Sequence, residues 1–200
     1  MTNREKSQKI VRPDAQNLAS AAAEAGKRGL PPVHLWNPPD CGEIDMRIAV
    51  DGTWFYQGTP IGRPEMVRLF STILRKDDER YVLVTPVEKV GIVVEDVPFV
   101  AVDFTATGEG EDQVLTFETN VGDRVAAGPE HKLVFRGDPG AGEVVPYIDV
   151  RRGLEARVDR KSFYRLVERS VHAEVDGEIW RGLWSGGAFF AMVRAESQDE

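Results

Sequence analysis

Apolar and polar residues alternate from Ile44 to Asp51, which predicts a β-strand with one buried and one exposed face. The dipeptide Asp51-Gly52 ends this run and is a strong signal for a β-hairpin, with Thr53–Tyr56 as the returning strand. Apolar residues then recur at helical spacing between Arg63 and Arg75, which predicts a helix over residues 63–75. The pattern therefore predicts a hairpin followed by an amphipathic helix.

Part of this pattern occurs twice in the chain. Ile44–Arg47 returns as Ile148–Arg151, with Ile, Asp and Arg at the same places. The arginine-led helix at residues 63–75 returns at residues 160–169, where Asp159 is the expected N-cap. Because strand and helix recur in the same order, the sequence predicts an internal duplication.

Strand-prone runs separated by Gly, Pro and Asp fill much of the remaining sequence, which indicates the α+β class. A further helix is expected over Ala15–Ala25, with Asp14 as its N-cap, and the Gly-rich segment Gly137–Gly142 is the expected boundary between the halves. The predicted division is an N-terminal helical and flexible lead at residues 1–29, a first β-rich half at 30–137 with the helix 63–75, a second half at 143–193 with the helix 160–169, and a polar tail at 194–200.

Charge is unevenly distributed along the 200 residues. The chain has 25 Lys and Arg against 33 Asp and Glu, a formal charge of −8, which disfavours binding to nucleic acid polymers and to anionic membranes. Residues 77–130 are strongly acidic, whereas residues 151–169 contain seven basic and three acidic side chains. We therefore expect a small anionic ligand near the second segment, and a protein partner remains an alternative.

Motifs for several common kinds of site are missing from the sequence. Cys41 is the only cysteine, and no stretch approaches 18 apolar residues, so we expect a cytoplasmic protein without an intrachain disulfide. The three histidines lie far apart without ligand spacing, so neither a metal nor another cofactor is expected. Gly140-Ala141-Gly142 lacks the third glycine of a dinucleotide-binding fingerprint, and Ser185 lacks the preceding glycine of a nucleophile elbow.

Four arginines occupy matching places in the two copies and are the first candidate ligand-binding residues. If the halves pack symmetrically, Arg47, Arg63, Arg151 and Arg160 would converge, and planar guanidinium groups suit phosphate or carboxylate. The structural alternative is that Asp45–Arg47 and Asp149–Arg151 form ion pairs on one face of each strand.

Aromatic and hydroxyl side chains complete the candidate set. Trp54 and Trp184 could stack on a flat ring, although tryptophans at strand spacing more often lie in the core. Thr85 and Ser185 come at matching strand ends, where a hydroxyl could bind a ligand or simply stabilise a turn.

Several distinctive segments resemble the bacterial family catalogued as domain of unknown function 1285, over about residues 30–193. They are Trp36-Asn37-Pro38, Ile44–Ile48, Asp51–Trp54, Gly58–Ile61, Arg63, Leu83–Glu88, Thr119-Asn120, Tyr147-Ile148, Arg151, Leu154, Arg160 and Trp184–Gly187. The resemblance implies a duplicated α+β core whose C-terminal half is superficially similar to pleckstrin-homology folds. It also implies a ligand site between the halves for a nucleotide-like molecule and a role in signalling, without an established activity.

The leading functional hypothesis is therefore a regulatory module that binds a small anionic, nucleotide-like ligand between its two halves. One alternative is a protein–protein interaction scaffold in which the Arg–Asp pairs are purely structural. The other is a hydrolase acting on a phosphorylated or nucleotide substrate, with Glu88 as general base. Under the leading hypothesis the protein is not an enzyme, so no catalytic residue is assigned.

Overall fold

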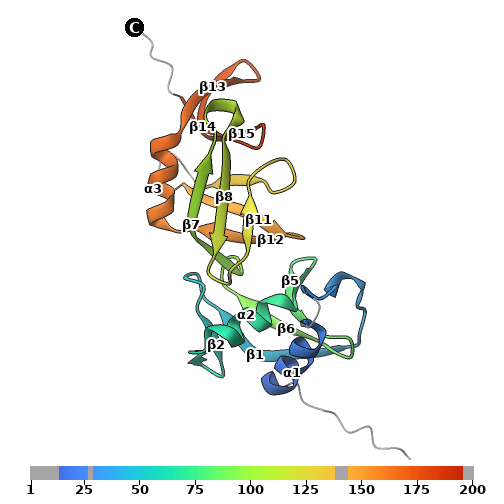
Figure 1. Cartoon of the computed structure of the whole chain (residues 1–200). Helices are drawn as coiled ribbons and strands as arrows, with labels where there is room; N and C mark the ends of the chain where they lie inside the picture. The colour runs from blue at the N-terminus through green and yellow to red at the C-terminus, as the bar shows by residue number, and fades with distance from the viewer. Residues whose placement is uncertain (1–13, 27–28, 138–143, 196–200) are drawn as a thin grey trace, which may run out of the picture. The chain divides into compact units, whose positions relative to one another are not determined.

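The structure is a computed structural model, and it describes residues 14–26, 29–137 and 144–195 (Figure 1). Contacts divide the chain into two compact units. The first contains residues 1–46 and 56–93, and the second contains residues 47–55 and 94–200. The predicted boundary at residues 137–142 lies almost entirely outside the described residues, as do parts of the predicted lead and tail.

The first unit contains two α-helices and most of a six-stranded sheet, whereas residues 47–55 of the same sheet and its first hairpin belong to the second unit. The sheet has the strand order β3-β2-β1-β6-β5-β4. α1 lies against α2 in this unit (Figure 1). The elements are α1 (Ala15–Ala25), η2 (Val33–Leu35), β1 (Asp40–Ile48), β2 (Trp54–Tyr56), β3 (Thr59–Pro60), α2 (Pro64–Thr72), β4 (Leu74–Asp77), β5 (Arg80–Val84) and β6 (Lys89–Val94).

The helices begin where the sequence predicts, but one of them ends earlier. The Asp14 side chain caps α1 by accepting from the Gln16 N–H at 3.1 Å. The prediction that the second helix runs to Arg75 is wrong, because α2 ends at Thr72 and β4 begins at Leu74. Leu74 is still buried, but it fills the core as a strand residue that pairs with β5, so the helical spacing of apolar residues misled the prediction at this end.

The second unit contains a six-stranded sheet, a three-stranded sheet and one helix. The larger sheet has the order β10-β11-β12-β7-β8-β9, with β12 and β7 parallel, and the smaller is the meander β13-β14-β15. α3 lies alongside β7, to which Arg165 is bonded through the Phe104 carbonyl at 2.9 Å (Figure 1). The elements are β7 (Phe99–Thr107), η3 (Gly110–Asp112), β8 (Val114–Thr119), β9 (Arg124–Ala126), β10 (Leu133–Arg136), β11 (Val145–Arg151), β12 (Leu154–Val158), α3 (Arg160–Arg169), β13 (Val171–Val175), β14 (Glu178–Ser185) and β15 (Ala188–Arg194).

The predicted duplication is confirmed in the order of elements. Each copy runs through a hairpin, a helix and a three-stranded meander: β1-β2-α2-β4-β5-β6 in the first and β11-β12-α3-β13-β14-β15 in the second. α3 directly follows the second hairpin strand β12, whereas the short strand β3 lies between β2 and α2, and the second copy is preceded by the additional strands β7 to β10. The protein is therefore α+β, with two β-rich halves that each carry a helix of the repeat.

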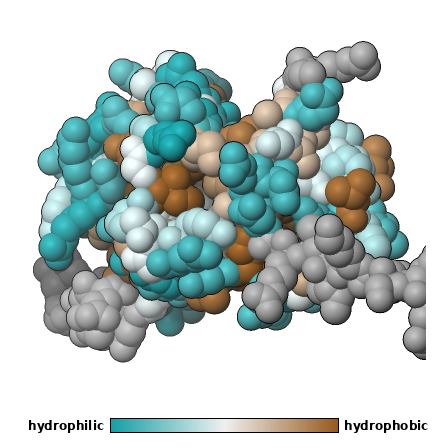
Figure 2. All heavy atoms as spheres, turned by 90° about the horizontal axis from the view of Figure 1, so that it is seen from below, coloured by the Kyte–Doolittle hydropathy of each residue, from teal (hydrophilic) through white to brown (hydrophobic). Residues whose placement is uncertain are grey.

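Apolar side chains of both units form the cores, and polar side chains cover them. The largest fully buried residues include Trp54, Phe70, Phe99, Phe104 and Phe117. Figure 2 shows one face of the molecule, on which hydrophilic residues predominate and apolar residues appear between them. None of the described helices has the length and apolar character needed to cross a membrane.

Candidate functional site

The strand arginines of the repeat are both paired with acidic residues from other segments. Arg47 forms an ion pair with Glu95 and lies 4.2 Å from the ring centre of Phe55. Arg151 forms an ion pair with Asp123, and its guanidinium lies 4.8 Å from the ring centre of Phe99. The structural alternative thus identified the kind of interaction, but these pairs are made with Glu95 and Asp123 rather than with the aspartates of the same strands.

The helix arginines of the repeat both stand at helix starts and both are exposed. Arg63 occupies the N-cap position of α2 and belongs to the first unit. Arg160 is the first residue of α3 and belongs to the second unit, as do Arg47 and Arg151. Within the described part of the chain, no hydrogen bond or ion pair involves the Arg160 side chain, so its charge is available to a ligand.

The two predicted tryptophans have different environments. Trp54 is 1% exposed and is one of the largest core side chains, so it offers no face for stacking. Trp184 is half-buried and packs against Phe189, with ring centres 5.2 Å apart at an angle of 57°. Both tryptophans therefore contribute to packing in the structure.

The two predicted hydroxyls are fully buried and bonded within the protein. Thr85 closes the turn between β5 and β6, because its hydroxyl accepts from the Glu88 N–H at 3.1 Å. Ser185 accepts from the Leu115 N–H at 2.9 Å and donates to the Ala127 carbonyl at 2.7 Å, which fastens the end of β14 to the larger sheet. These positions match in the repeat, and both stabilise strand ends.

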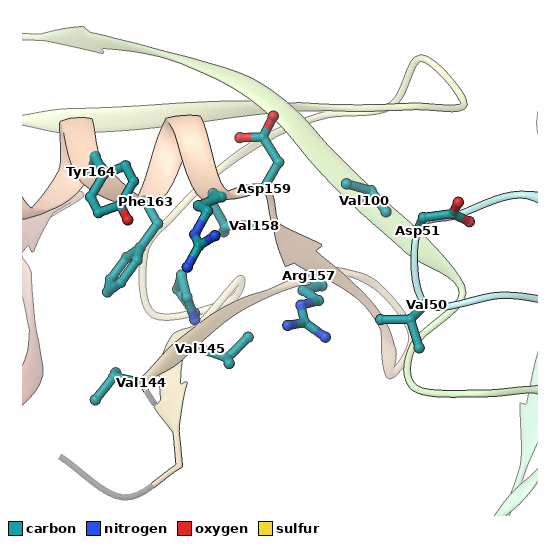
Figure 3. A pocket seen from close by; sticks show the side chains of 12 residues that line it. Val50, Asp51, Val100, Val144, Val145, Arg157, Val158, Asp159, Phe163 and Tyr164 are labelled. Atoms are coloured by element: carbon teal, nitrogen blue, oxygen red, sulfur yellow. The ribbon is translucent and has the colours of Figure 1, made fainter. Parts of the chain in front are cut away.

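A cavity of about 760 Å³ lies in the second unit and has the size of a small-molecule site (Figure 3). Its walls come from the tip of the β1–β2 hairpin, from β7, from β11 and β12, and from the first turn of α3. Residues of both predicted halves, 30–137 and 143–193, thus contribute to it. The lining residues are Val50, Asp51, Val100, Val144, Val145, Pro146, Arg157, Val158, Asp159, Arg160, Phe163 and Tyr164.

The α3 side of the cavity combines a cation with two aromatic rings. Arg160, Phe163 and Tyr164 are spaced i, i+3 and i+4, so they share one face of the helix. The rings of Phe163 and Tyr164 are 6.4 Å apart and inclined by 25°, and Tyr164 is 57% exposed. This face can hold an anionic group at the guanidinium and a flat ring against the aromatic side chains.

The second cation of the cavity, Arg157, is held by a polar network. Its Nη1 lies 3.3 Å from Asp96, which also accepts from the Tyr147 hydroxyl at 3.1 Å. Burial raises the pKa of Tyr147 and the adjacent Asp96 carboxylate raises it further, so the phenol stays a donor. Figure 3 shows the Arg157 guanidinium lying between the aromatic pair on one side and Val50 on the other.

The hairpin tip that carries Val50 and Asp51 is fixed by hydrogen bonds on both flanks. Glu95 accepts from the Val50 N–H at 3.0 Å, and the Asn120 amide donates to the Gly52 carbonyl at 3.4 Å. Gly52 has φ +82°, and a Cβ there would lie 2.7 Å from the Asn120 amide nitrogen, so the contact requires glycine. The tip is therefore a preformed wall of the cavity.

Two carboxylates also line the cavity, and both are engaged in turns. The N–H of Thr53 bonds to Asp51 at 2.9 Å, and this bond is the main reason why the pKa of Asp51 is lowered. Asp159 caps α3 by accepting from the Ser162 N–H at 2.7 Å. Among the described residues that line the cavity, both carboxylates are thus engaged in local hydrogen bonds, and neither is free to act as a general base.

Arg160 is the one predicted site residue that lines this cavity, and the other lining residues were missed. Two signals in the sequence could have identified some of them. Arg157 lies in the basic segment 151–169, and Phe163 and Tyr164 follow Arg160 at the spacing of one helix face. For Val50 and Asp51 the sequence predicts only a strand and a turn, because nothing in it indicates which segment this hairpin contacts. No group of three or more potential metal ligands occurs among the described residues.

Comparison with known proteins identifies relatives over nearly the whole described chain. Residues 31–97 match the domain of unknown function (DUF1285), N-terminal domain, and residues 98–192 match the protein of unknown function (DUF1285), C-terminal domain. A search of functionally curated proteins gave no significant match.

Two crystal structures are similar to this chain. A DUF1285 family protein from Silicibacter pomeroyi DSS-3 is 55% identical, with a TM-score of 0.81 over 92% of this chain and 98% of the other. One from Shewanella baltica OS155 is 28% identical, with a TM-score of 0.49 over 63% of this chain and 92% of the other. Since both family models match and the first relative shares more than half of its residues, the chain belongs to the DUF1285 family.

Proposed function

We propose that the protein is a ligand-binding regulatory module whose site is the cavity in the second unit. The ligand is a small anionic, nucleotide-like molecule, and the setting is the cytoplasm. The observation that carries this proposal is the combination, on one face of α3, of an exposed arginine without a described internal partner and two adjacent aromatic rings. The phosphate or carboxylate binds Arg160, and the ring of the ligand lies on Phe163 and Tyr164.

The surroundings of these residues support a preformed site. Valines of the hairpin, β7, β11 and β12 provide apolar walls, and Arg157 is already oriented by Asp96. A ligand therefore does not have to order these side chains when it binds, which lowers the entropic cost of binding. The cavity draws residues from both predicted halves, 30–137 and 143–193.

The hydrolase alternative is less well supported by the geometry. Burial raises the pKa of Glu88, the suggested general base, which suits that role, but Glu88 lies in the first unit after β5 and is not among the residues that line the cavity. The Asp51 carboxylate of the cavity has a lowered pKa and is correspondingly a weak base at neutral pH. The scaffold alternative predicts that no small molecule binds, which the following experiment decides.

The test is a thermal-shift screen of the full chain against nucleotides, cyclic and dinucleotide second messengers and sugar phosphates. A ligand at about a hundred times its dissociation constant stabilises the fold by roughly 2.7 kcal/mol, which raises the melting temperature by roughly 5–11 °C. The shift should be lost in Arg160→Gln and retained in Arg169→Gln, a matched change of an exposed arginine at the other end of α3. If no compound shifts the wild-type protein, or if both variants respond like it, the site is refuted.

A further inference from the structure

We infer, resting on the proposed function, that the cavity selects a ligand with a single anionic group and neighbouring hydroxyl or amine donors. Polyphosphates are discriminated against. Nucleoside monophosphates and similar molecules are the class that fits, and nucleoside triphosphates are not.

The first reason is the supply of positive charge. Arg160 has no described internal partner, whereas the charge of Arg157 is shared with Asp96 at 3.3 Å. Two other arginines of the basic segment 151–169 form ion pairs with residues that do not line the cavity: Arg151 pairs with Asp123, and Arg165 pairs with Asp103. Among the described residues that line the cavity, Arg160 is thus the one cation without an ion-pair partner, which suits one anionic group.

The second reason is that a carboxylate, Asp159, caps the start of α3. Free N–H groups at a helix start attract phosphates in many nucleotide sites. Here the Asp159 carboxylate accepts from the Ser162 N–H at 2.7 Å and places its own negative charge at that end. One N–H of the helix start is therefore taken up by the cap, and the carboxylate of Asp159 weakens the attraction of this end for additional phosphates.

The third reason is the carboxylate of Asp51 at the hairpin tip. The bond from Thr53 lowers the pKa of Asp51, so its side chain is ionised at neutral pH. The bonds of Glu95 to Val50 and of Asn120 to Gly52 hold the tip, so the charge cannot easily swing away. An ionised carboxylate accepts hydrogen bonds from hydroxyl or amine groups and repels phosphate.

Taken together, two positive and two negative side chains line the cavity in the part of the chain that the structure describes. A single phosphate or carboxylate is matched by the charge of Arg160 and the shared charge of Arg157, whereas each further phosphate adds negative charge to a cavity that already contains two carboxylates. Like charges brought together at a binding interface weaken binding strongly, so we expect adenosine monophosphate to bind at least about tenfold more tightly than metal-free adenosine triphosphate.

The experiment is isothermal titration of the full chain with adenosine monophosphate and with adenosine triphosphate, in the presence of a chelator. It is repeated on Asp51→Asn, which keeps the side-chain acceptor of the turn but removes the charge. Asp176→Asn is the control, because Asp176 also precedes the glycine of an Asp-Gly turn, between β13 and β14, and does not line the cavity. The preference for the monophosphate should fall several-fold in Asp51→Asn and stay unchanged in Asp176→Asn.

The outcomes separate this inference from the proposed function. If both nucleotides bind but the triphosphate binds as tightly, or if Asp51→Asn leaves the preference unchanged, the inference is wrong and the anion site stands. If neither nucleotide binds the wild-type protein, both the inference and the nucleotide-like class of the proposed function are refuted.

Discussion

Asp77 is the residue whose replacement should change stability most clearly with pH. Its carboxylate accepts from the Arg75 Nε at 2.6 Å, from the Arg75 Nη2 at 2.8 Å and from the Lys89 Nζ at 3.0 Å. The same Arg75 donates to the carbonyls of Val33 and Trp36 at 2.7 Å each. Asp77 therefore holds the arginine that ties the segment before β1 to β4.

The size of the effect follows from the pKa of this carboxyl group. The hydrogen bond from Arg75, followed by that from Lys89, lowers the pKa of Asp77 from 3.8 to about 2. A difference of this size corresponds to about 2 kcal/mol of folding stability. Because the pKa is lower in the folded protein, this stability is present above pH 3.8 and is lost as the pH falls towards about 2.

The perturbation is Asp77→Asn, and the assay is urea unfolding between neutral pH and pH 3. We expect the variant to be less stable by about 2 kcal/mol at neutral pH, with the difference shrinking as the pH approaches 3. The matched control is Glu79→Gln, whose side chain is 97% exposed in the same turn and should change stability by less than about 0.5 kcal/mol. A deficit that stays constant with pH, or an equal loss in the control, would refute the reasoning.

Three further variants test other parts of the structure. Ser185→Ala removes a fully buried hydroxyl and leaves the Leu115 N–H and the Ala127 carbonyl without it, so urea unfolding should show a loss of about 1–3 kcal/mol; a loss near zero would contradict this role. Asp149→Asn should stabilise the protein at neutral pH, because burial raises the pKa of Asp149. The stability linked to the protonated carboxyl group is lost as the pH rises through this raised pKa, and the neutral amide avoids that loss. A lower melting temperature of the variant at neutral pH would contradict the raised pKa. Gly52→Ala should lower the free energy of unfolding by about 1 kcal/mol or more and weaken ligand binding, because the added Cβ collides with the Asn120 side chain. Calorimetry would show the loss of stability and titration the loss of affinity. Unchanged binding would mean that the hairpin tip does not shape the cavity.

Much of the fold could be predicted from the sequence because local signals agreed with the tertiary structure. Asp14 and Asp159 cap the helices that follow them, and the Asp-Gly dipeptides at residues 51–52 and 176–177 form turns between strands. The end of α2 could not be predicted in this way. Its apolar positions continue into Leu74, and the choice between helix and strand was decided by pairing with β5, which is a non-local interaction.

The candidate site was predictable only in part, for a similar reason. The repeat drew attention to Arg160, which lines the cavity, but it gave equal weight to Arg47 and Arg151, which are paired with Glu95 and Asp123. Those partners lie far away in the sequence, and the pattern within each repeat contains no trace of them. The contribution of the hairpin tip to the cavity likewise depends on Asn120, whose side chain bonds to residues on two other segments.

The most direct test of the central claim is NMR chemical-shift mapping of the backbone amides while adenosine monophosphate is added. The account predicts that the largest changes fall on Val50 to Gly52 and on Arg157 to Tyr164, and that they disappear in Arg160→Gln. Changes confined to the strands β4 to β6, or changes that persist in Arg160→Gln, would contradict a site at the start of α3.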